Sequence, residues 1–173
     1  MSSIEPDAKD WTWTLDRACP DCGFDAAAVP PDDIARLVTA YTEQWAGVLA
    51  RPDVATRPDP TTWSPLEYAC HVRDVCDLFA DRVGLMLDED GAAFANWDQD
   101  ATAVESDYAS QDPRVVADEL AVAADRLAQA YAGLSGPAWE RRGVRSNGSE
   151  FTVLTLGRYG LHDLAHHLWD VRA

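Results

Sequence analysis

Apolar side chains recur along most of the chain at the 3.6-residue period of an amphipathic helix. The first such run contains Ile34, Val38, Tyr41, Trp45 and Val48. Later segments repeat the pattern and are separated by stretches rich in proline, glycine and acidic residues. The periodicity predicts four helices, over about 32–50, 64–87, 112–135 and 152–173. At 1.5 Å per residue each of them would be about 30 Å long.

The predicted helix starts carry capping residues. Ser64 suits an N-cap, the proline after it suits the first helical position, and Glu67 completes a capping box. Asp112 precedes a proline in the same way, and Thr152 suits the N-cap of the last helix. These local signals place the helix boundaries independently of the apolar periodicity.

The remaining segments show little periodicity. Positions 1–30 read as an irregular lead-in, and 88–111 form a long acidic loop of a kind that is often functional. Asn147-Gly148 is a turn signal, but no strand pair is evident beside it. We therefore expect an all-α four-helix bundle over 31–173, preceded by the irregular N-terminal segment 1–30.

Composition narrows the function classes. The chain has 173 residues, a formal net charge of −16 and 47% hydrophobic residues, which is enough for one domain with a substantial core. A surface this acidic repels phosphate backbones and anionic lipids, so we expect neither nucleic-acid nor membrane partners. The N-terminus lacks the basic and apolar regions of a signal peptide, so we expect a cytoplasmic protein with reduced cysteines.

Histidines are the candidate metal ligands of this chain. Only four occur, and His162 and His166 are four residues apart, a spacing that puts both rings on one side of a helix. His71 on a separate helix would supply a third imidazole. Three protein ligands with an open position are typical of a catalytic metal site.

Helix geometry adds detail to this hypothesis. His71 falls at the edge of the apolar face of its helix, where it is shielded but reachable. His162 and His166 lie nearly opposite the aliphatic stripe of the last helix, so they face either solvent or a cleft. Aromatic residues on the same side favour a cleft between the second and fourth helices, whereas His167 points elsewhere.

Two segments resemble a known family. Trp63-Ser-Pro-x-Glu67-x-x-x-His71-Val-x-Asp74 resembles the first signature of the DinB/YfiT-like superfamily, and Tyr159-Gly-Leu-His162-Asp-Leu-Ala-His166-His167 resembles the second. The resemblance covers roughly 31–173. It implies a four-helix bundle with a divalent metal, usually zinc or nickel, held by three histidines. Carried over residue by residue, the ligands would be His71, His162 and His166.

The resemblance also implies an activity. The superfamily includes mycothiol-dependent maleylpyruvate isomerase and S-transferases that use mycothiol or bacillithiol. The alanine- and aspartate-rich composition resembles that of actinobacterial members, whose usual thiol is mycothiol. We therefore expect metal-activated thiol transfer or isomerisation on a small electrophilic substrate, and a homodimer is one assembly that the family implies. No residue is assigned a catalytic or cofactor-binding role.

Two other functions stay open. Water in place of thiol would make the protein a metal-dependent hydrolase, although the H-D-x-x-H run has a shorter acid than the H-E-x-x-H of zinc proteases. A bundle whose metal site has no turnover would be a non-catalytic, stress-related binding protein. Asp74, Asp163 and Asp170 lie near the histidines and are candidates to orient a ligand imidazole, or they are solvated surface acids.

A cysteine motif precedes the bundle. Cys19-Pro-Asp-Cys22-Gly has the pattern of a zinc knuckle, a turn whose two cysteines supply two of the four ligands of a structural zinc site. Such a site would need two more ligands. Cys70 and Cys76 are the remaining cysteines, but six residues apart on a helix they do not share a face. The alternatives are a redox pair or two free thiols in a plain turn.

Overall fold

The computed structural model describes residues 4, 6 and 9–173, so part of the predicted lead-in, at positions 1–3, 5, 7 and 8, lies outside the described residues. The helices are α1 (Ile34–Thr42), α2 (Trp45–Leu49), α3 (Pro65–Asp88), α4 (Gln99–Glu105), α5 (Pro113–Tyr131) and α6 (Val153–Asp170). Single 3-10 turns are η1 (Thr12–Leu15), η2 (Ala26–Ala28), η3 (Pro31–Asp33), η4 (Tyr108–Ser110) and η5 (Gly136–Glu140).

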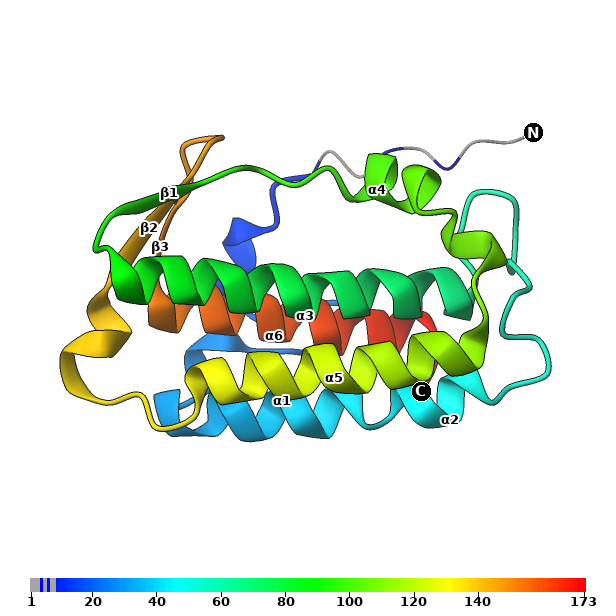
Figure 1. Ribbon diagram of the computed structural model, residues 1–173, viewed down its shortest axis with the longest axis horizontal. Coiled ribbons are helices and arrows are strands. Elements are labelled where there is room, and N and C mark those ends of the chain that lie inside the picture. The colour runs from blue at the N-terminus through cyan, green and yellow to red at the C-terminus, as the bar shows by residue number, and fades with distance from the viewer. Residues whose placement is uncertain (1–3, 5, 7–8) are drawn as a thin grey trace.

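The long helices form the predicted four-helix bundle. Helix α3 packs against α5 and α6, and α1 packs against the same two helices from the other side (Figure 1). Helices α3 and α6 are antiparallel neighbours, because the ring of His71 meets His167 while Phe79 lies against Gly160. The predicted apolar face of α3, from Val72 to Met86, is buried in the core.

The capping predictions are confirmed. The Ser64 side chain accepts from the Glu67 N–H, and the Glu67 carboxylate accepts in return from the Ser64 N–H at 2.8 Å. Helix α6 begins at a second box, between Thr152 and Thr155. The first box fixes the start of α3 and so places His71 two turns along it.

The predicted first helix is wrong as one continuous element. It breaks into α1 and α2 beside Thr42, whose hydroxyl donates to the carbonyl of Val38 at 2.8 Å. Such a bond competes with the backbone ladder and bends helices. The third helix also ends earlier than predicted, at Tyr131, before Gly133 takes up a positive φ of 77°.

A small sheet contradicts the prediction that no strands pair. Its strands are β1 (Ala92–Phe94), β2 (Arg142–Arg145) and β3 (Glu150–Thr152), in the order β1-β2-β3. Strands β2 and β3 are antiparallel and flank the Asn147-Gly148 turn, whereas β1 pairs in parallel with β2. Strands of three or four residues are too short to show alternation in sequence.

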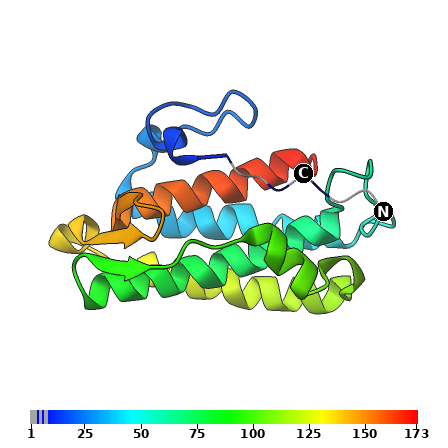
Figure 2. The same ribbon diagram turned by 90° about the horizontal axis from the view of Figure 1, so that it is seen from above.

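The N-terminal segment covers α6 on the side away from the core. Figure 2 shows the blue segment, which includes η1, lying over the orange and red helix, and both η1 and η2 contact α6. Both sides of α6 are therefore packed. None of the helices in the described ranges is long and apolar enough to cross a membrane.

Candidate metal centre

His71 lies at the centre of the candidate site. Its side chain is fully buried, and its ring stacks on Trp97 with centroids 5.3 Å apart and planes within 9°. Trp63 packs on it at 5.5 Å. Neither ring nitrogen of His71 forms a hydrogen bond, although Nε2 lies within ion-pair distance of Asp163 Oδ1. Buried polar atoms are rarely left in this state without a role.

Helix α6 presents Asp163 and His167 to His71. These two residues are four apart and share one side of the helix. Asp163 Oδ1 lies 3.3 Å from His71 Nε2 and 3.4 Å from His167 Nε2. One potential ligand atom from each residue lies within 4.8 Å of the others. We call His71, Asp163 and His167 the histidine–aspartate cluster.

Electrostatics keep the aspartate ionised. Burial opposes the charge on Asp163, but the nearby rings of His167 and His71 outweigh it and hold the pKa of this carboxyl well below its usual range. An ionised carboxylate beside two imidazoles offers the oxygen and nitrogen ligands that divalent metals bind.

A second group of potential ligands lies on the neighbouring side of α6. Cys19, Cys22, His162 and His166 each offer one atom within 4.8 Å of the others, and we call them the cysteine–histidine cluster. Cys19 Sγ lies 3.6 Å from His166 Nδ1. Burial lowers the pKa of His162 to about 4, so its imidazole is neutral at neutral pH. Burial raises the pKa of the Cys22 thiol to about 11.

Asp170 connects the two clusters. His167 Nδ1 donates to Asp170 Oδ2 at 2.8 Å, which leaves Nε2 of that ring directed at Asp163. The other oxygen, Oδ1, lies 3.9 Å from His166 Nε2. Of the predicted orienting acids, Asp170 thus contacts the histidines directly, whereas Asp74 accepts from Tyr108 and Arg73.

The predicted ligands do not gather in one group. His71 lies in the histidine–aspartate cluster, and His162 with His166 lies in the cysteine–histidine cluster. A single ion held by all three histidines stays a prediction. The expectation that His167 points elsewhere is wrong, because its ring centroid lies 4.8 Å from that of His71.

The cysteines separate in the same way. Cys70 and Cys76, considered as partners for the N-terminal knuckle, are buried in α3 and belong to neither cluster. Cys70 contacts the oxygens of Tyr108 and Gln111 instead.

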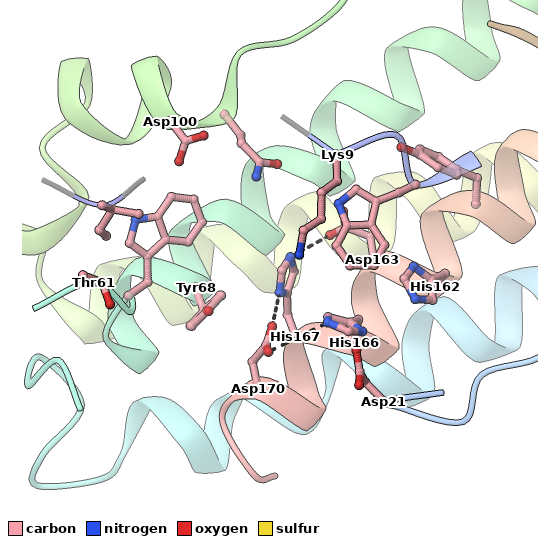
Figure 3. A pocket seen from close by; sticks show the side chains of 15 residues that line it. Lys9, Asp21, Thr61, Tyr68, Asp100, His162, Asp163, His166, His167 and Asp170 are labelled. Atoms are coloured by element: carbon pink, nitrogen blue, oxygen red, sulfur yellow. Dashed lines mark hydrogen bonds and ion pairs between the residues drawn. The ribbon is translucent and has the colours of Figure 1, made fainter. Parts of the chain in front are cut away.

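A cavity of about 330 Å³ opens beside the histidine–aspartate cluster. Its lining includes Asp163, His167 and Asp170 from α6 and Trp63 with Tyr68 from around the start of α3. Figure 3 shows the histidines of α6 and the acids around them pointing into this space, with Lys9 reaching over it. The volume suits a small molecule.

A second hollow of about 390 Å³ adjoins the first and shares Asp163, Tyr159 and Trp11 with it. Its walls include Arg82 and Arg145, which are both buried. Trp97, from the long acidic loop 88–111, lines this hollow while it stacks on His71. Two spaces therefore meet at the aspartate of the cluster.

The histidine–aspartate cluster fits a divalent metal. Two imidazoles and one carboxylate are a common ligand set for catalytic zinc and for iron. His71 Nε2 and Asp163 Oδ1 are buried without a hydrogen bond and lie 3.3 Å apart, so one ion between them would satisfy both atoms.

The model of the DinB superfamily matches residues 25–171. The chain belongs to the DinB superfamily. This confirms the resemblance read from the Trp63–Asp74 and Tyr159–His167 segments. None of the curated proteins compared with this chain matches it.

A solved structure supports the same DinB fold. The chain is similar to YfiT from Bacillus subtilis, with a TM-score of 0.67 and 17% sequence identity over 98% of this chain and 90% of that one. YfiT is described as a probable metal-dependent hydrolase with an unusual four-helix bundle topology. At this identity the likeness establishes the fold, which is the predicted all-α bundle.

Proposed function

We propose that this DinB-superfamily protein is a metal-dependent enzyme that acts on a small molecule, with the ion held by His71, Asp163 and His167. The observation that carries the proposal is the meeting of these three ligand atoms, with Asp163 and His167 at the wall of a cavity and His71 buried behind them. Zinc and nickel are the metals that the family resemblance favours.

The residues of the chain have separable roles in this site. Asp170 orients His167 through the hydrogen bond to Nδ1, and the Trp97 ring holds the plane of His71. A divalent cation in the cluster would polarise a substrate and lower the pKa of a thiol or a water molecule. Trp63 and Tyr68 exclude water from one side of the space where the substrate lies.

Thiol transfer or isomerisation is the reaction we favour. Such a reaction needs room for two reactants beside the same ion, and the two adjoining hollows share Asp163. We propose a mycothiol-type thiol in one hollow and a small electrophile in the other. The buried guanidinium groups of Arg82 and Arg145 give the second hollow affinity for an anionic group.

Hydrolysis is the second candidate. It is favoured by the description of YfiT as a probable metal-dependent hydrolase and by Asp170, a carboxylate at the cavity wall that could accept a proton from water. A hydrolase would use one hollow for its substrate and none for a thiol.

The test is turnover of a panel of small electrophiles by the zinc- or nickel-loaded protein, with and without mycothiol. We expect turnover that requires both metal and thiol and that falls at least about 100-fold in Asp163→Asn. Asp125→Asn, at an exposed position of α5, is the matched control and should leave turnover unchanged. Turnover without thiol would favour the hydrolase, and full activity in Asp163→Asn would refute the site.

We also propose a cytoplasmic location, since the cysteines at 19, 22, 70 and 76 are free and reduced thiols persist in that compartment. We propose further that the protein is of actinobacterial origin and that it forms a homodimer. Each chain would divide into a lead-in (1–30) and a bundle domain (31–173). Light scattering on the purified protein tests the homodimer, which predicts a mass near 38 kDa, about twice that of the 19.0 kDa chain.

A further inference from the structure

The cysteine–histidine cluster has no part in the proposed reaction, yet it holds four side chains that bind metals. Cys19 and Cys22 come from the N-terminal segment, and His162 and His166 come from α6, about 140 residues later. Soft thiolates combined with imidazoles are the ligands that zinc prefers in closed structural sites.

The turn that carries the cysteines is built to bring both sulfurs to one side. The Cys19 N–H donates to the Phe24 carbonyl at 2.9 Å, and the Gly23 N–H donates back to the Cys19 carbonyl at 2.9 Å. Gly23 has a φ of 74°, a conformation that favours glycine over other residues. The Cys-Pro-Asp-Cys-Gly run is therefore folded as a tight knuckle.

The α6 side matches this knuckle. In a tetrahedral zinc site, bond lengths of about 2.3 Å to sulfur and 2.05 Å to nitrogen place the two ligand atoms about 3.6 Å apart. The separation of Cys19 Sγ from His166 Nδ1 is 3.6 Å. His162 is 4% exposed, and its Nε2 is buried with no hydrogen-bond partner.

We propose that Cys19, Cys22, His162 and His166 form a second, structural metal site that binds one zinc ion. A disulfide between the cysteines would leave His162 Nε2 unsatisfied, whereas a zinc ion satisfies all four side chains. Four protein ligands close the coordination shell, so this ion is structural and leaves no position for a substrate.

The site fastens the N-terminal segment to the bundle. Trp11 packs on His162 and His166 with ring centroids 5.7 and 5.4 Å away, and it lines both hollows. Loss of the zinc would release Trp11 from α6 and remove one wall of the cavity. The proposal stands apart from the proposed reaction, because it uses different ligands.

Cobalt titration of the chelator-treated, reduced full chain tests the proposal. Thiolate-bound cobalt absorbs in the near ultraviolet through sulfur-to-metal charge transfer, which cobalt bound by histidine and aspartate does not. We expect this band to saturate by two added cobalt ions per chain, when both clusters are filled, and to vanish in Cys19→Ser/Cys22→Ser. It should persist in Cys70→Ser and in His71→Ala, so failure of the histidine–aspartate site would not be mistaken for failure of this one.

Wild-type protein gives a second readout that does not depend on variants that fold. Zinc K-edge absorption fine structure of the protein loaded with two equivalents of zinc, enough to fill both clusters, should show sulfur neighbours at about 2.3 Å, averaging one per zinc ion. A shell of nitrogen and oxygen alone, or a charge-transfer band that survives in Cys19→Ser/Cys22→Ser, would overturn the proposal.

Discussion

Removal of the Asp170 carboxylate should weaken the two metal sites unequally. Asp170 Oδ2 accepts from His167 Nδ1 at 2.8 Å, whereas Oδ1 lies 3.9 Å from His166 Nε2, beyond hydrogen-bond range. Loss of an acceptor that orients a ligand imidazole commonly costs 10–100-fold in metal affinity, or about 1.4–2.7 kcal/mol. We expect that loss at the histidine–aspartate cluster in Asp170→Ala, and a change of no more than about fivefold at the cysteine–histidine cluster.

The assay is competition of each variant with a chromophoric zinc chelator, with the cobalt–thiolate band reporting the cysteine–histidine cluster separately. Asp170→Asn keeps an acceptor for His167 Nδ1 without the charge, so its affinity should fall between those of wild type and Asp170→Ala. Asp100→Asn, which removes a charge from the lining of the same cavity but lies in neither cluster, should change affinity by less than about threefold. Equal losses at both clusters, or a loss in Asp100→Asn as large as in Asp170→Ala, would refute the orienting role.

Three further predictions concern the bundle itself. A Cβ at Gly160 would lie 2.9 Å from the Phe79 ring, whereas Gly84 has open space, so Gly160→Ala should be about 1–3 kcal/mol less stable than Gly84→Ala in urea unfolding; equal stabilities would contradict the close packing of α3 on α6. Burial raises the pKa of Glu67, but hydrogen bonds from a guanidinium and from the α3 cap outweigh it and lower the pKa, so its ionised form stabilises the fold. Glu67→Gln should therefore lower the free energy of unfolding by about 1–3 kcal/mol above pH 5, and this difference from wild type should shrink as the pH falls below 4. A difference that grows in acid would contradict the prediction. Burial raises the pKa of the Cys70 thiol to about 12, so iodoacetamide at pH 8 should label it at least about tenfold more slowly in native than in unfolded protein, as peptide mass spectrometry would measure; equal rates would place this thiol at the surface.

Local signals made most of the bundle predictable. The Ser64 box, the prolines that follow the N-caps and the apolar period each depend on residues a few positions apart, so they are readable in sequence. The break beside Thr42 was missed because the apolar period continues across it. Strand β1 was missed because its partner, β2, lies about 50 residues away and gives no local pattern.

The residue types of the site could be predicted from the sequence, but which of these residues lie together could not. His162 with His166 and Asp163 with His167 are both pairs at i and i+4, on adjacent sides of the same helix. The sequence does not show which pair faces α3, because the segment that covers the other pair comes from the distant N-terminus. The signal that was available is the Asp163–His167 spacing itself, which puts a carboxylate and an imidazole on one side of the helix.

Anomalous diffraction at the zinc edge from crystals of the zinc-loaded protein tests the central claim most directly. The account predicts one peak between His71, Asp163 and His167, beside the cavity, and a separate peak in the cysteine–histidine cluster. A single peak that joins His71 to His162 and His166, or no peak at His71, would contradict it.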